Sequence, residues 1–527
     1  MANYDAIIIG GGHNGLVCAA SLANARKKVL VLEQRRNLGG AAATEEVFPQ
    51  FLVNTGATDA GLFLPEIIEK FGLVAAGLQV FQSDAAVFAP QPDGTAITLW
   101  RDLNRTVSEL QTLYPDDAKR FLKFNAKMNK MSQALRPALL RSAPNIDSLN
   151  VRELIEWAQP ALKIRQLGKK DMMEFLRVLP LSASELLDEW FQSAALKGLL
   201  STIGVTASHL GPRAAGTAFL MLYHYTGREN GGFKSSWFIR GGIGRLAESL
   251  AEYARKNGAE IRVASPVDQI FVNDQDEAVG VRLEDGEKLF AKAIISNANP
   301  RTTFFDLVGA PYLDPGFVRD VQNIRFRGVT ARMNLALKRL PTFTAASGDP
   351  KQLSGHIIIS PSVDYLERAS DAAKYGDFSR QPMLDIVIPT ISDPILAPEG
   401  KHIMNINMQY APYQLRSGSW ESERESLAET IIQTLAEYAP DLPDAIDQQQ
   451  LITPLDWERD YGLAEGCGYH GQMALDQLMF MRPVAGWGRH RTPIKNLFLC
   501  GAGAHPGGGV TGAPGFNAAK EVLRTLR

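Results

Sequence analysis

The stretch Tyr4-Asp-Ala-Ile-Ile-Ile-Gly-Gly-Gly-His-Asn-Gly15 decides how the chain begins to fold. Its apolar run at residues 6–9 is typical of a buried parallel strand. The glycines at 10, 12 and 15 then form G-x-G-x-x-G, directly before a helix that the composition predicts over residues 15–26. Such a strand–turn–helix unit binds a dinucleotide, because the glycines let a diphosphate approach the backbone and the unpaired N–H groups of the helix N-terminus.

The residues that follow extend this unit. A second strand is predicted over residues 29–33, and it ends in Glu33, whose carboxylate can accept hydrogen bonds from a ribose diol. Arg35 and Arg36 follow the acid, and Gly39 and Gly40 offer a second point of close approach for a long dinucleotide. A glycine-rich turn without a ligand is the alternative, which the strand–helix–strand context disfavours.

A third glycine-rich segment, Cys500–Gly515, lies between a strand predicted over residues 497–500 and a helix predicted over residues 514–526. A backbone with so few side chains can press against a flat ring, and the N–H groups of the helix N-terminus suit the negative charge of a reduced flavin. A flexible surface loop is the alternative, although the segment contains no Ser, Lys or Glu. Residues 241–244 (Gly-Gly-Ile-Gly) follow no convincing strand, so we interpret them as a turn that opens a helix over residues 246–256.

Composition excludes several classes of protein. The 527 residues are 45% apolar and 21% charged, with 55 Lys and Arg against 57 Asp and Glu, so the net charge is −2. This balance gives no general attraction to nucleic acid. The cysteines Cys18, Cys467 and Cys500 form no C-x-x-C pair, so neither a dithiol centre nor a metal site is expected. The sequence predicts a cytoplasmic protein with no membrane-spanning segment, and the apolar run 214–223 is either a core helix or a peripheral membrane contact.

Several blocks resemble the phytoene desaturase superfamily of FAD-dependent oxidoreductases: GGGHNGLVCAASLA, VLVLEQRRNLGGAAAT, WFIRGGIGRLAESLAEYARKNGAEI, AIISNANP and LFLCGAGAHPGGGVTGAPGFNAA. Within it, GHNGL and the stretch 481–515 are most similar to the branch of pyridine nucleotide-disulfide oxidoreductase domain-containing protein 2, and GHNGLVCAA also occurs in flavoenzyme β-carotene ketolases. Because the sequence has no C-x-x-C motif, we do not expect the disulfide chemistry that the branch name indicates.

The resemblance implies an α/β fold: a Rossmann-like FAD-binding domain of the two-dinucleotide-binding type, a substrate domain with a mixed β-sheet, and a helical insert. We assign residues 1–65, 236–300 and 490–527 to the first, residues 66–105 and 301–489 to the second, and residues 106–235 to the insert. The implied cofactor is FAD. Its expected contacts are Gly10, Gly12, His13, Asn14, Gly15, Glu33, Gln34, Arg35, Gly39, Gly40, Ala41, Ala42, Val267, Asn297, Gly501, Ala502, Val510, Thr511, Gly512 and Ala513.

The expected reaction is flavin chemistry, in which the protein supplies position and exclusion of water. We find no protein nucleophile arrangement, and His13, His470 and His505 are the candidates for proton transfer, with a structural role as the alternative. The first hypothesis is an oxidoreductase that dehydrogenates or oxidises an apolar small molecule, with oxygen or a quinone as acceptor. A carotenoid desaturase, isomerase or ketolase is the second, and an FAD-stabilised interaction protein without catalysis is the third. The sequence does not predict an oligomeric state.

Overall fold

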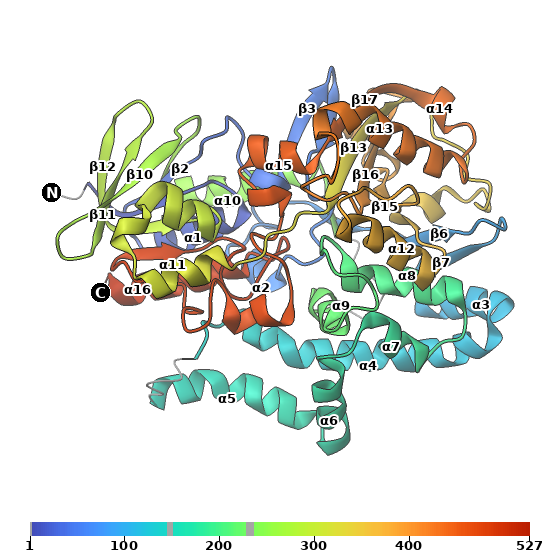
Figure 1. The fold of residues 1–527 in the computed structure, drawn as a ribbon, viewed down its shortest axis with the longest axis horizontal. Helices are drawn as coiled ribbons and strands as arrows, with labels where there is room; N and C mark the ends of the chain where they lie inside the picture. The colour runs from blue at the N-terminus through green and yellow to red at the C-terminus, as the bar shows by residue number, and fades with distance from the viewer. Residues whose placement is uncertain (1–2, 145–150, 228–236, 527) are drawn as a thin grey trace.

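The computed structural model describes residues 3–144, 151–227 and 237–526. Figure 1 shows two sheets lying side by side, with a group of helices beneath the second sheet. Both predicted sheets and the helical insert are present, so the predicted α/β fold class is confirmed. Among the described residues, no helix is long and apolar enough to cross a bilayer.

The first sheet has the order β10-β11-β12-β1-β2-β9, and β18 also pairs with β12. Strands β9, β2, β1, β12 and β18 run parallel, whereas β10 and β11 form an antiparallel extension of β12. The bounds are β1 Tyr4–Ile9, β2 Val29–Leu32, β9 Glu260–Arg262, β10 Val267–Val272, β11 Ala278–Leu283, β12 Lys288–Ser296 and β18 Leu497–Leu499. The carboxyl ends of parallel strands are where open α/β sheets bind ligands.

Helices α1 (His13–Asn24), α10 (Gly244–Lys256) and α16 (Ala513–Thr525) pack together against this sheet, and their apolar residues share one core cluster. Helix α1 begins at His13, two residues earlier than predicted, because the extended backbone of Gly12 already ends the turn. The first and last helices meet at Gly515, where an added Cβ would lie 1.9 Å from the Asn14 carbonyl oxygen. Residues from opposite ends of the chain therefore build one wall.

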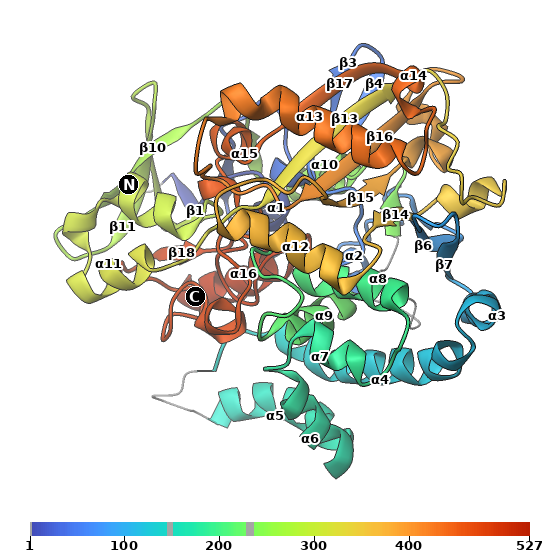
Figure 2. The ribbon, with the colours of Figure 1, turned by 45° about the vertical axis from the view of Figure 1, so that its right-hand side comes forward.

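The second sheet has the order β17-β13-β16-β15-β14-β6-β7, antiparallel except for the pair β14–β6. This is the mixed sheet that the sequence predicts. Helix α13 (Trp420–Ala436) crosses its outer face, as Figure 2 shows, and packs on alternating apolar residues of the strands. The bounds are β6 Ala85–Pro90, β7 Ala96–Trp100, β13 Thr330–Leu337, β14 His356–Ile359, β15 Met383–Val387, β16 His402–Gln409 and β17 Ile446–Ile452.

The insert is helical, as predicted: α3 Leu103–Leu113, α4 Pro115–Leu139, α5 Val151–Gln166, α6 Lys169–Val178, α7 Ala183–Asp188, α8 Ala194–Val205 and α9 Thr217–Tyr225. A capping box formed by Ser182 and Glu185 starts α7. Helix α9 is almost entirely buried, so the run 214–223 is a core element and the idea that it docks on lipid is wrong. The domain boundaries stay a prediction, and the one at residue 236 lies outside the described residues.

The crossing of α1 and α16 gives a first test. We expect Gly515→Ala to lower the free energy of unfolding by about 1–3 kcal/mol, because the methyl group would force the Asn14 backbone aside. The measurement is chemical denaturation of the FAD-loaded protein. Glu252→Ala, at an exposed position of α10, is the control. Equal stability of the two variants would contradict the close helix contact.

Candidate functional site

A cavity of about 460 Å³ lies between the two sheets. Its lining comes from the turn after β1, the end of β2, the 39–42 and 56–62 segments, helices α8 and α9, strands β13, β15 and β16, the 457–470 region and the last glycine-rich segment. Segments far apart in the sequence therefore share a single cavity. One end is walled by glycine backbone, and aromatic and polar side chains wall the rest.

The glycine-lined end lies at the carboxyl ends of the parallel strands. Gly10 follows β1, Glu33 follows β2 and Asn297 follows β12, and all three line the cavity. The Gly39 N–H donates to the Gly11 carbonyl oxygen at 2.9 Å, which brings the second glycine pair beside the first. Gly15 has a different task, because its Cβ would lie 2.1 Å from the Gly10 oxygen and would push α1 off the turn. This arrangement is the diphosphate cradle that the sequence predicts.

Glu33 is held in place by backbone. The Gly11 N–H donates to its Oε2 at 2.7 Å and the Arg35 N–H donates to its Oε1 at 2.8 Å. Burial raises the pKa of this carboxyl above its ordinary value, and the N–H groups of Arg35 and Gly11 partly offset that effect. Each carboxylate oxygen keeps a further acceptor site, so a ribose diol can bind without displacing the backbone.

Two polar atoms in this part of the cavity support a dinucleotide ligand. The Arg35 Nη1 and the His13 Nε2 are buried and find no hydrogen-bond partner among the described residues. Buried donors and acceptors rarely stay unpaired in the working state of a protein. The Arg35 side chain is fixed by Glu45, 2.8 Å away, and by the Tyr461 ring, which leaves Nη1 for an anionic ligand. The residues present therefore fit a flavin dinucleotide.

The structure brings most of the predicted contacts together. The cavity is lined by Gly10, Gly12, His13, Asn14, Glu33, Gln34, Arg35, Gly39, Gly40, Ala41, Ala42, Val267, Asn297, His470, Ala502 and Val510. Gly15, Gly501, Thr511, Gly512, Ala513 and His505 do not line it. Gly512 instead packs on α2 (Pro65–Lys70), where an added Cβ would lie 2.8 Å from the Ile67 side chain. The assignment of individual cofactor contacts stays a prediction.

Of the three candidate histidines, His505 is fully buried and His13 and His470 are partly buried, and all three are neutral near pH 7. Burial lowers the pKa of His13, His470 and His505 to about 4. His505 lies outside the cavity, where its ring stacks on Phe480 at 5.2 Å and its Nε2 donates to the Ala138 carbonyl oxygen at 3.2 Å. His505 therefore packs α4 against the glycine-rich segment, which is the structural alternative that the sequence left open.

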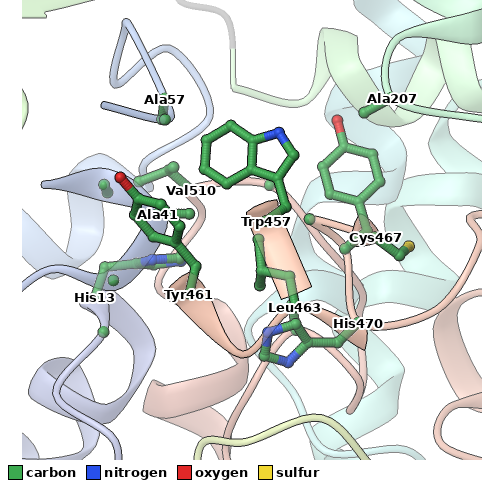
Figure 3. Close-up of a pocket in the computed structure, with 18 of the residues that line it drawn as sticks. His13, Ala41, Ala57, Ala207, Trp457, Tyr461, Leu463, Cys467, His470 and Val510 are labelled. Carbon is green, nitrogen blue, oxygen red and sulfur yellow. The ribbon is translucent and has the colours of Figure 1, made fainter. Parts of the chain in front are cut away.

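An aromatic wall begins beside the glycine cradle, where the Tyr461 ring packs on the Arg35 guanidinium. Trp457 and Tyr461 project from α15 (Pro454–Tyr461) with ring centroids 4.8 Å apart. Figure 3 shows the Trp457 ring in the middle, the Tyr461 ring on the side of His13 and Val510, and Cys467 and Ala207 on the opposite side. Trp457 is 6% exposed. Such a wall holds an apolar molecule and keeps water out.

Sequence reasoning missed a row of buried polar side chains on the inner face of the second sheet. Asp385, Asn407 and Arg332 lie directly opposite one another on β15, β16 and β13. The fully buried Arg332 donates from Nη1 to Asn407 at 2.8 Å and from Nε to Asn334 at 3.0 Å, and burial lowers its pKa to about 10. Asp385 and Asn407 line the cavity, so the lining is polar as well as aromatic. The available signal was the polar residue at every second position over 330–334 of β13 and 405–409 of β16.

A dinucleotide cradle at the ends of a parallel sheet, opening into a closed cavity over a second sheet, defines an FAD-dependent oxidoreductase. The three cysteines Cys18, Cys467 and Cys500 are buried and free.

The chain belongs to the flavin-containing amine oxidoreductase family, whose model matches residues 15–523. It is 33% identical to pyridine nucleotide-disulfide oxidoreductase domain-containing protein 2 of Rattus norvegicus, over 99% of this chain and 94% of the relative. It is 28% identical to one of the limonene dehydrogenase subunits of Castellaniella defragrans, over 99% and 95%. An oxidoreductase structure from Methanosarcina mazei has the same fold, with a TM-score of 0.60, 16% identity and coverage of 98% and 99%. The predicted branch and the FAD cofactor are confirmed.

We expect Glu33→Gln to weaken FAD binding about tenfold, which is ~1.4 kcal/mol, because a neutral amide accepts weaker hydrogen bonds from a ribose diol than a carboxylate does. The measurement is a fluorescence titration of the flavin-free protein with FAD. Glu46→Gln is the control, since Glu46 is exposed and does not line the cavity. Unchanged FAD affinity in Glu33→Gln would remove this residue from the site.

The neutral histidines also predict how stability depends on pH. In the unfolded chain a histidine protonates near pH 6.5, whereas in the folded protein His505 protonates only near pH 4. The unfolded state thus binds more protons between these values, and stability falls as the pH drops from about 6.5 toward 4. We expect His505→Gln, which can still donate to Ala138, to reduce proton uptake on unfolding at pH 5 by about one. Unfolding midpoints measured from pH 7 to 4.5 give this number, and an unchanged pH slope would refute it.

Proposed function

We propose that this chain is an FAD-dependent dehydrogenase or oxidase of a small, largely apolar organic molecule, with molecular oxygen or a quinone as electron acceptor. The observation that carries the proposal is the continuity of the cavity, which leads from the glycine cradle to the aromatic wall without a break. A substrate bound against the aromatic wall would lie next to the flavin ring of an FAD bound in the glycine cradle.

The residues that line the cavity suggest which roles belong to the cofactor and which to the protein. Bound FAD supplies a two-electron acceptor at the ring. The glycine backbone and Glu33 bind the dinucleotide, and Trp457 and Tyr461 orient the substrate and exclude water. Residues 241–244 offer no second nucleotide site, because they pack tightly on the Thr44 and Asn54 side chains at the start of α10. Oxygen or a quinone therefore suits the role of acceptor better than a pyridine nucleotide.

Cavity size favours a small substrate. A volume of about 460 Å³ lies at the lower end of the range for one drug-sized ligand, roughly 300–1,000 Å³. The relative from Castellaniella defragrans, which is named for limonene dehydrogenase, supports a small substrate. A carotenoid would need a long apolar tunnel, and the test below distinguishes this alternative.

Anaerobic flavin reduction tests the proposal. The FAD-loaded protein is mixed with a panel of terpenoid alcohols, amines, hydrocarbons and C40 polyenes, and flavin absorbance is followed before and after addition of oxygen or a soluble quinone. We expect a small substrate to bleach the flavin and the acceptor to restore it. Bleaching by polyenes alone would select the carotenoid alternative. A flavin that no substrate reduces and that, after photoreduction, neither acceptor reoxidises would select the non-catalytic role.

A variant that fills the cavity sharpens this test. Ile203 is 5% exposed and lines the cavity from α8, away from the glycine cradle. We expect Ile203→Trp to slow flavin reduction at least about tenfold at fixed substrate while FAD content stays unchanged, because the indole takes the place of substrate. Ile203→Val is the matched control and should retain reduction. Loss of FAD in Ile203→Trp would mean that the two ends of the cavity are not separate sites.

A further inference from the structure

The buried imidazole of His356 is held between two carboxylates that line the cavity. Its Nδ1 lies 2.6 Å from Asp385 Oδ1, and its Nε2 lies 3.4 Å from Asp59 Oδ2. The His356 side chain is 1% exposed, whereas those of Asp385 and Asp59 are 11% and 22% exposed. Asp59 is thus the member of the group that is most open to the cavity.

The three side chains are fixed by different parts of the fold. His356 begins β14 and Asp385 lies on the neighbouring β15, while Asp59 comes from the loop after β4 (Phe51–Asn54). The Phe238 ring stacks on the imidazole at 6.1 Å, and the Gly61 N–H donates to Asp59 Oδ1 at 2.8 Å. The imidazole therefore has one orientation, with a carboxylate at each nitrogen.

The charged groups around the His356 imidazole bear on its protonation state. Two carboxylates so close to one imidazole favour its doubly protonated, cationic form, because nearby opposite charges stabilise the charged state of a titratable group. The facing titratable groups are Tyr469, toward Asp59, and Arg332, toward Asp385. From the remaining sides, β6 (through Val87) and Phe238 of β8 (Trp237–Ile239) present apolar residues. A cationic imidazole at this place favours the ionised form of Asp59.

We propose that Asp59 is the proton acceptor of the reaction, that His356 and Asp385 are its positioning residues, and that the substrate consequently carries a hydroxyl or amino group on the carbon that is oxidised. This inference rests on the proposed function, and it narrows the substrate from apolar molecules in general to an apolar body with one polar X–H group, where X is oxygen or nitrogen.

In the proposed oxidation, a hydride and a proton leave the substrate for different acceptors. The C–H electron pair leaves as hydride to the flavin, the X–H bond gives its proton to the Asp59 carboxylate, and the X electron pair forms the C=X double bond. The flavin is reduced by two electrons and the substrate is oxidised by two. The proton on Asp59 then leaves through the partly exposed carboxylate. A pure hydrocarbon offers no X–H proton, so this arrangement would be of no use to it.

The first measurement needs no substrate. In nitrogen-15 NMR of the histidine-labelled holoprotein at pH 7.5, we expect one imidazole with both nitrogens protonated that is absent from His356→Gln. It should persist in His402→Gln, a matched control on β16 whose Nδ1 contacts Thr390 outside the cavity lining. His13, His470, His490 and His505 should give neutral rings at this pH, because burial lowers their pKa values to about 4, 4, 3 and 4. A neutral His356 would overturn the proposal.

The second measurement is the rate of anaerobic flavin reduction as a function of pH. We expect Asp59→Asn to slow reduction by about a hundredfold or more, Asp59→Glu to recover part of the rate, and His356→Gln to change the pH profile, with FAD content unchanged in each variant. His402→Gln should keep the wild-type profile. Wild-type rates and pH profiles in Asp59→Asn, or reduction only by hydrocarbons without an X–H group, would overturn the inference.

The two measurements separate this inference from the proposed function. If no substrate reduces the wild-type flavin, the proposed function fails, and with it the role of Asp59, even where the NMR shows a cationic His356. If alcohols or amines reduce the flavin and Asp59→Asn keeps the full rate, only the inference fails. If His356→Gln does not fold, Asp59→Asn and Asp59→Glu still decide the outcome, because the Asp59 side chain is more exposed and less tightly held.

Discussion

The fold depends on a contact between backbone atoms at the two ends of the chain. Gly515 on α16 lies so close to the Asn14 carbonyl that no side chain fits between them. This contact holds the last glycine-rich segment over the first turn, where His13 reaches the Gly509 backbone. More than 480 residues separate these segments in the chain, yet both line one cavity. The cradle therefore forms only when the N-terminal and C-terminal segments of the chain are packed together.

In a sheet with one covered face, the polar residues usually lie on the outer face and the apolar residues on the inner face. The second sheet has the opposite distribution. Its outer face carries the apolar residues and is covered by α13, whereas its inner face carries Arg332, Asn334 and Asn405, each 0% exposed. Burying such groups costs free energy unless each finds a partner. Here the side chains bond to one another across the strands. A polar lattice of this kind gives the cavity a rigid floor.

Local motifs were enough to predict the glycine cradle, because the residues from Gly10 to Gly40 are near one another in sequence and each has a known role in the turn. The polar end could not be predicted in this way. Residues 330–334 of β13 and 405–409 of β16 alternate between polar and apolar, which normally indicates a face in water. Only the tertiary structure shows that this face is internal, and only pairing between strands brings His356 to Asp385. For the same reason, His505 had the right neighbours in sequence but lies outside the cavity.

The two walls of the cavity differ in a way that bears on chemistry. The glycine wall offers backbone, one fixed carboxylate and neutral imidazoles, so charge on the cofactor is met by dipoles that hardly change with pH. The sheet wall holds the carboxylates of Asp59 and Asp385 with the imidazole between them, and its charge depends on where one proton resides. Electrons and protons leaving a substrate between these walls would therefore depart in opposite directions. That separation requires no movement of the backbone, because both walls are already built into the folded chain.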